Sequence, residues 1–194
     1  EMAVRVFGRN GISVIASIEY DGNNCLRDEY PFNDGQVALG ADTALLVSRE
    51  GAQPSGRPPN ERGYSPGWNF LHPRVEELAL SVAADVAAKF ADQPNFLGVN
   101  WTQYLTGEWT PGYGSRSWSD PLLYSYDDAT IARFEKDTGL DVPGEPPDPT
   151  RFAQRAQFLC AEDMRARWVQ WRCEKTREFY LKARDAVRAA DPDA

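Results

Sequence analysis

The chain has 194 residues, 42% of them hydrophobic and 26% charged, which is the composition of a soluble globular domain with a core of its own. Its formal net charge of −8 disfavours nonspecific binding to nucleic acid or to an anionic membrane, and no apolar run approaches the ~20 residues that span a bilayer. The charge and the lack of a spanning run therefore predict no nucleic acid and no membrane among its partners. No P-loop, GxGxxG or HExxH motif occurs, so an NTPase, a dinucleotide enzyme or a zincin is unsupported, and we expect no cofactor.

Cysteine and histidine usage argues against a zinc centre. Cys25, Cys160 and Cys173 form no CxxC pair, and His72 is the only histidine. We therefore predict no metal site, and the odd number of cysteines predicts at least one free thiol.

The chain opens with a helix and a strand. Residues 2–9 are predicted to be the end of a helix that is closed by Gly8 or Gly11, and residues 12–18 to be a strand. The near-continuous apolarity of this strand predicts burial on both of its faces, as in a parallel sheet. Residues 20–72 then show few periodic signals, apart from a short strand predicted over residues 44–47.

A second helix and a second strand follow. Pro73 suits the first turn of a helix, because its missing N–H costs nothing there, and the helix should stop near residues 92–94. Residues 96–100 are predicted to be a strand. The apolar stripe of the helix is predicted to consist of Val75, Leu78, Ala79, Val82, Val86 and Phe90.

The last third of the chain is predicted to be helical. Ser125 and Asp128 resemble a capping box at the start of a helix that runs to Gly139, with Ile131 and Phe134 turned inward. Residues 150–190 would span about 60 Å as one helix, which exceeds a domain of this size, so we expect a break near residues 161–163. The predicted stripe of this region is Val169, Cys173, Thr176, Tyr180, Ala183 and Val187, flanked by Trp168, Trp171 and Phe179.

This order of elements predicts an α/β fold. Strands that alternate with helices imply a parallel sheet, but two firm strands and one weak strand cannot close a barrel of eight. We therefore expect an incomplete or partial (β/α) barrel segment with parallel strands, long excursions and a long C-terminal helical region. Residues 1–194 would form a single α/β domain, as a segment of a larger (β/α)8 barrel protein.

Aromatic residues gather after the second predicted strand. Seven of the fourteen Trp and Tyr residues lie in residues 101–126. Flat rings with nearby polar groups suit a sugar-binding cleft, whereas the alternative is that the rings only anchor a long loop to the core.

Two parts of the chain carry a resemblance to known families. Residues 69–76, the helix after them and residues 95–101 resemble the middle of a TIM-barrel glycoside hydrolase of the family 10 glycosyl hydrolase-like group. Residues 126–139 and 168–185 resemble a beta-galactosidase-like hydrolase segment. The resemblance implies a barrel fold and activity on carbohydrate.

The chain departs from this family at the end of the second strand. Where relatives place carboxylates, this sequence has Asn100, Trp101, Thr102 and Gln103, and the nearest acid is Glu108. The acid of the family at that position is therefore not carried over.

Two carboxylates remain as catalytic candidates. Glycoside hydrolysis needs a pair of carboxyl groups, which in a barrel come from the C-terminal ends of strands. Glu19 directly follows the first strand and Glu108 follows the second, so we predict these two as the pair. The alternative for Glu19 is an ion pair with an arginine such as Arg49, or a solvated position in a loop.

Further residues of the chain are predicted to bind substrate. One of them is His72, for which the alternative is a role in capping the helix that follows it. We expect carbohydrate as the ligand, and exposed sheet edges that can drive formation of a homodimer. A non-catalytic sugar-binding domain and a structural barrel fragment are the alternative functions. The predicted substrate-binding residues are Asp21, Arg49, His72, Asn100, Trp101, Gln103, Trp109 and Trp118.

Overall fold

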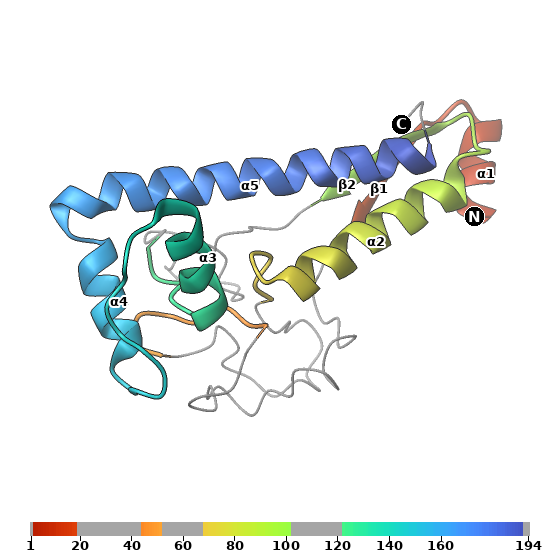
Figure 1. The fold of residues 1–194 in the computed structure, drawn as a ribbon. Coiled ribbons are helices and arrows are strands. Elements are labelled where there is room, and N and C mark those ends of the chain that lie inside the picture. Colours follow the sequence, from red (N-terminus) through yellow and green to blue (C-terminus); the bar gives the residue numbers. More distant parts are fainter. Residues whose placement is uncertain (1, 19–43, 52–67, 102–121, 192–194) are drawn as a thin grey trace. The chain divides into compact units, whose positions relative to one another are not determined.

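The computed structural model describes residues 2–18, 44–51, 68–101 and 122–191 (Figure 1). These ranges form a mixed α/β structure with helices, a two-stranded parallel sheet and a long C-terminal helix, whereas closure into a barrel stays a prediction. None of the described helices is long and apolar enough to cross a membrane. The elements in chain order are α1 (Met2–Arg9), β1 (Val14–Ile18), α2 (Pro73–Phe90), β2 (Phe96–Trp101), α3 (Asp128–Thr138), α4 (Arg151–Leu159) and α5 (Glu162–Ala190).

The chain divides into two compact units, which share α2 and α5. The sheet unit is made of the described residues within Glu1–Tyr20, Glu76–Gln103 and Arg177–Ala194. The helical unit is made of those within Asp21–Val75 and Tyr104–Thr176.

In the sheet unit, β1 and β2 pair in parallel, as the chain order predicts. Ser17 lies opposite Asn100, and Ile18 lies opposite Trp101. The register is irregular between Val14 and Ala16, and Gly98 on the facing strand has a φ of 123°, a backbone angle that favours glycine. The two predicted strands are confirmed.

Burial on both faces of the first strand is a wrong prediction. Ile15 is 59% exposed, and Ile12 and Leu97 are also more than a third exposed, whereas Ile18 and Phe96 are buried. Phe90 at the end of α2 contacts Phe96 with ring centroids 5.4 Å apart, so α2 lies against the buried face. An apolar run looks the same in sequence whether one or both faces are covered, which is why the pattern misled.

Helix α2 begins at Pro73 and ends before residues 92–94, as predicted. Its most deeply buried positions are Val75, Ala79, Ala83 and Ala87. The other large residues of the predicted stripe are only half-buried, namely Leu78, Val82, Val86 and Phe90. Small residues at the centre of a stripe let a neighbouring backbone approach closely. Within the sheet unit, Lys182 of α5 forms an ion pair with Glu76 of α2.

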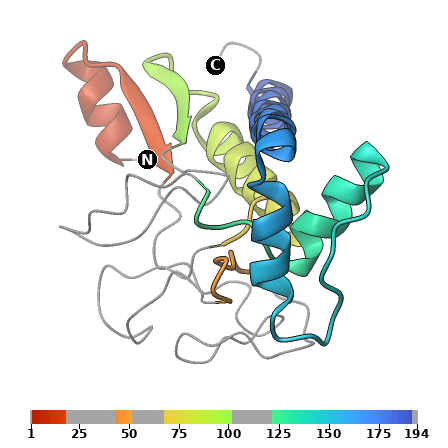
Figure 2. The same cartoon turned by 90° about the vertical axis from the view of Figure 1, so that its left-hand side faces the viewer.

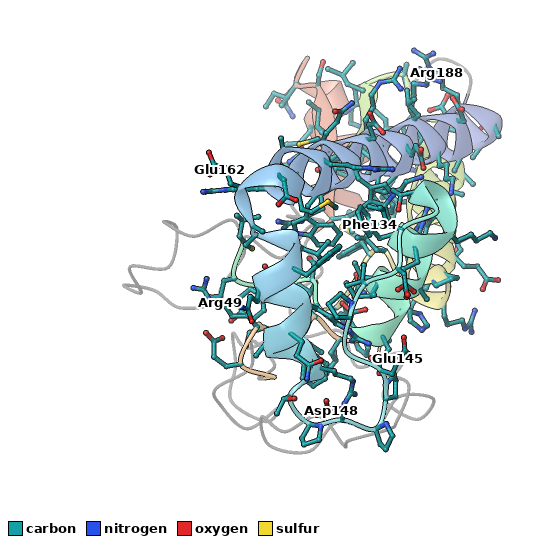
Figure 3. The ribbon with its side chains drawn as sticks, turned by 60° about the vertical axis from the view of Figure 1, so that its left-hand side comes forward. Arg49, Phe134, Glu145, Asp148, Glu162 and Arg188 are labelled. Carbon is teal, nitrogen blue, oxygen red and sulfur yellow. The ribbon has the colours of Figure 1, made fainter. Side chains whose placement is uncertain are left out.

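The helical unit has a core of aromatic rings. Phe134 of α3 meets Trp168 and Trp171 of α5 edge-on, with centroids 5.1 and 5.2 Å away, and the two tryptophans stack at 5.3 Å. Figure 3 shows Phe134 in the interior of this unit. The inward prediction for Ile131 and Phe134 is confirmed.

The stripe predicted for the C-terminal helical region is wrong at three of its six positions. Val169 and Tyr180 are 39% and 41% exposed and Cys173 is exposed, whereas the predicted flanks Trp168 and Phe179 are buried. The side chains with the largest apolar area therefore set which face of α5 turns inward.

Local signals place the other element ends to within two residues. The break in the helical region is confirmed, since α4 ends at Leu159 and α5 begins at Glu162. Helix α3 ends at Gly139, which is left-handed with a φ of 67°. Its N-cap is Asp127 and not Ser125, because the Asp127 carboxylate accepts from the Thr130 N–H.

The strand predicted over residues 44–47 is wrong. Leu45 and Ser48 form only isolated antiparallel bridges, to Trp68 and to Tyr124 respectively. All of residues 44–48 are nevertheless buried. The apolar pattern therefore indicated a buried segment and not a strand that pairs along its length.

Candidate functional site

The carboxyl ends of β1 and β2 lie side by side. Ser17 and Asn100 are register partners, and the Asn100 Nδ2 donates to the Ser17 Oγ over 3.4 Å. Both residues are exposed. In parallel α/β structures, substrates bind beside the carboxyl ends of the strands. Of the predicted substrate ligands, Asn100 is thus at the expected position.

Most of the predicted site lies outside the described residues. This holds for the two candidate carboxylates, Glu19 and Glu108, so their separation stays untested. Trp101 closes β2 opposite Ile18, and its side chain is outside the described part. The other predicted ligands outside the described residues are Asp21, Gln103, Trp109 and Trp118.

Arg49 belongs to the helical unit. Its Nε pairs with the Glu50 carboxylate at 3.1 Å, and its backbone N–H donates to the Leu123 carbonyl. With Glu50, Gln157 and Cys160 it lines a shallow hollow of about 380 Å³ beside α4. Figure 3 shows Arg49 at the surface of this unit.

His72, also in the helical unit, is 5% exposed and sits directly before α2. Its Nδ1 accepts from the Arg74 N–H at 3.2 Å, and its backbone N–H donates to the Asn69 carbonyl. The first N–H groups of a helix lack partners within the helix, and the imidazole satisfies one of them. This geometry supports the capping alternative.

The same contact bears on a serine-nucleophile pattern. Residues 63–67 have the Gly-x-Ser-x-Gly spacing of a nucleophile elbow and lie outside the described residues. A triad histidine donates from Nδ1 to an acid. His72, the only histidine, instead accepts at Nδ1, so it does not have the geometry of a triad base.

A buried polar cluster that sequence reasoning missed joins residue 69 to the start of α3. The Asn69 Nδ2 donates to the Asp127 carboxylate at 2.8 Å and to the Thr130 Oγ1 at 2.9 Å. Thr130 also donates to Asp127 through its N–H and its hydroxyl. Burial raises the pKa of Asp127 to about 6, although the hydrogen bonds from Thr130 oppose the rise.

The neighbouring acid, Asp128, is held by two arginines one turn apart on α4. The Arg151 Nε and Nη2 reach its two oxygens at 3.0 and 3.1 Å, and the Arg155 Nη1 reaches it at 2.6 Å. Although burial raises the pKa of Asp128, hydrogen bonds from Arg151 and Arg155 bring it below its usual value. The oxygens of Asp127 and Asp128 are thus committed to holding α3, and we assign neither acid a catalytic role.

Tyr126 is buried next to this cluster, directly before Asp127 in the chain. Its hydroxyl lies 2.6 Å from the Leu122 carbonyl and 3.2 Å from the Cys160 Sγ. Burial raises the pKa of the Tyr126 hydroxyl, so it stays protonated at neutral pH.

One group of acids approaches the spacing of a cation site. Carboxylate oxygens of Glu135, Asp141 and Glu145 lie within 4.8 Å of one another, and Glu135 also accepts from the Val142 N–H. A calcium ion takes six to eight oxygen ligands, and Asp141 and Glu145 are exposed. Three surface carboxylates do not define a metal centre.

Comparison of the chain with protein family models, with curated proteins and with solved structures finds no match. The resemblance to glycoside hydrolases is therefore tested by none of these comparisons. The described part of the site is a parallel pair of strands whose carboxyl ends adjoin, and the side-chain amide of Asn100 lies at these ends.

Proposed function

We propose that this chain is a carbohydrate-active, glycoside hydrolase-like domain that acts on or binds an oligosaccharide or polysaccharide. The observation that carries the proposal is the register of the sheet, in which Ser17 faces Asn100 and Ile18 faces Trp101. The segments that begin with Glu19 and Thr102 therefore start from neighbouring strand ends. Barrel enzymes bind substrate at the carboxyl ends of their strands.

The proposed chemistry uses acids that follow the two strands. Glu19 would act as acid/base or substrate ligand, and Glu108 would act as the second carboxylate. Trp101, Trp109 and Trp118 would stack on sugar rings.

Amide groups would bind sugar hydroxyls at the same edge. Gln103 is one such group by sequence, and Asn100 is the one whose position the structure describes. The Asn100 side chain is exposed and reaches no described group except the Ser17 hydroxyl, so its carbonyl oxygen can accept from a hydroxyl.

A non-catalytic sugar-binding domain, or a structural barrel fragment, is the second candidate. The neutral pair Asn100 and Ser17 at the described strand ends favours it, because neither side chain can act as a general acid or base at neutral pH.

A paired binding and turnover experiment tests both candidates. The wild-type chain and the variants Glu19→Gln, Glu108→Gln and Trp109→Ala are compared on a glycan array and on aryl glycosides. Glu162→Gln, at an exposed position of the first turn of α5, is the matched control.

For the enzyme, we expect loss of turnover by about 100-fold or more in the two glutamate variants and unchanged turnover in the control. Glycan binding without turnover would favour the second candidate. Neither binding nor turnover on any glycan would contradict the proposal as a whole.

A further inference from the structure

The edge of β2 that faces away from β1 is open in the part of the chain that the structure describes. The sheet has two strands there, so β1 covers only one edge of β2. A strand directs about half of its N–H and C=O groups to each side, and an uncovered edge is a template for a further strand. Figure 2 shows β2 between β1 and the C-terminal half of α5.

A hollow of about 370 Å³ runs along this open edge. Four successive residues of β2, Leu97–Asn100, line it, and no residue of β1 does. Because successive side chains of a strand point to opposite faces, a hollow that meets four in a row follows the backbone edge and not one face. The opposite wall is formed by Ala83 of α2 and by residues of α5, among which Ala183 and Val187 supply an apolar part.

The charged residues that line the hollow are both arginines. Arg184 pairs with Asp185 of its own helix. Arg188, in the last turn of α5, makes no ion pair or hydrogen bond within the described ranges, and Figure 3 shows it projecting from the end of the helix. The hollow therefore offers a hydrogen-bonding backbone edge, an apolar part of its wall and a cation that has no ion pair among the described residues.

The strand β2 contains no acidic residue. Pairing of β2 with β2 of a second copy would thus bring no counter-charge to Arg188 and would add the arginines of the partner copy. Charge complementarity favours a different polypeptide that carries a carboxylate.

We propose that this hollow binds an extended segment of a polypeptide partner other than a second copy of this chain. The segment adds as a third strand to the open edge of β2, with apolar side chains against Ala183 and Val187 and a carboxylate at Arg188. Strand addition of this kind takes its affinity from main-chain hydrogen bonds and its specificity from the side chains beside them. The 57% exposed Leu97 would gain a cross-strand neighbour. This inference does not rest on a role in carbohydrate binding.

Synthetic octapeptides test the strand geometry with the intact chain. They alternate valine and threonine and carry one glutamate, placed near either end in two versions. For each version, two isomers carry N-methyl groups at alternate residues. One isomer has lost the N–H groups along one edge of the peptide, and the other has lost those along the opposite edge. Binding is measured by fluorescence anisotropy. We expect one isomer of the binding peptide to lose at least tenfold in affinity and the other to bind as the unmodified peptide does. Equal affinity of both isomers, or no binding by any peptide, would overturn the proposal.

A charge swap tests the contact with Arg188. The glutamate peptide should bind about two- to fivefold more tightly than the same peptide with lysine, as exposed ion pairs allow. Arg188→Gln should remove this preference, whereas Arg165→Gln, at an exposed position of α5 in the helical unit, should keep it.

Light scattering of the same samples tests the competing occupant. We expect Val99→Pro, which removes a strand N–H, to weaken peptide binding without changing the mass in solution. A dimer that Val99→Pro dissociates would contradict the proposal and support the homodimer expected from sequence.

Discussion

The helical unit and the sheet unit differ in how completely each buries its large apolar side chains. The helical unit buries Trp168 fully and pairs Asp127 and Asp128 with donors from other parts of that unit. The sheet unit leaves Ile15 and Leu97 more than half exposed. A region with its aromatic rings packed and its acids at the start of α3 paired is a source of stability, whereas one with an open edge and exposed apolar groups is suited to recognition.

The largest expected effect is removal of the aromatic core of the helical unit. Trp168→Ala should lower the free energy of unfolding by about 4 kcal/mol, because the indole packs against Phe134 and Trp171 and no solvent reaches it. Chemical denaturation measures this loss. Val169→Ala, at the next and exposed position, is the control and should cost less than about 0.5 kcal/mol. Similar losses for both variants would remove the distinction between the two faces of α5.

The arginine pair around Asp128 should give the next effect. Arg151→Ala should destabilise the chain by about 3 kcal/mol, since it leaves Asp128 without its two-point partner. Arg165→Ala is the surface control on α5. If thermal and chemical unfolding show that Arg151→Ala lowers the free energy of unfolding by less than about 1 kcal/mol, the ion pair of Arg151 with Asp128 contributes no more than an exposed pair.

Asp127 predicts a dependence of stability on pH. Its folded pKa of about 6 lies above the ordinary value of 3.8, so the folded state holds the proton more tightly than the unfolded state does. The contribution is complete below pH ~4 and is lost as pH rises through ~6, by at most about 3 kcal/mol. Asp127→Asn cannot ionise there, so the stability of the wild-type chain should fall relative to this variant between pH 4 and 6. A constant difference between the two proteins over that window would contradict the raised pKa.

Substitutions on the exposed apolar side chains of the sheet unit should have the smallest effect. Leu97→Thr should change the free energy of unfolding by less than about 0.5 kcal/mol, because the side chain is 57% exposed and threonine suits a strand. Phe96→Ala, on the buried face of the same strand, should cost several times more. A large loss for Leu97→Thr would mean that this face is already covered within the chain.

Sequence patterns predicted the features that depend on neighbouring residues. Pro73 marks the start of α2 and Gly139 the end of α3, because each residue acts through its own backbone geometry. The parallel pairing of β1 and β2 also followed from the chain order of strand, helix and strand.

Features that depend on distant residues were not accessible in this way. The contact of Asn69 with Asp127 joins positions 58 residues apart, and nothing in either local sequence announces it. The inward face of α5 was misassigned because the choice between Val169 and Trp168 depends on which face meets Phe134. The position of Asn100 at a strand end was predictable, but the open edge beside it depends on which strands are neighbours.

Residue-level hydrogen exchange of the backbone amides is the measurement that tests the difference between the two units most directly. We predict that amides of β2 that point away from β1 exchange rapidly, while those in α3 and around Trp168 exchange only on global unfolding. The glutamate octapeptide should slow the exchange of the β2 amides alone. Uniform protection of both edges of β2 in the free chain would contradict the account, because it would mean that the sheet unit is already complete.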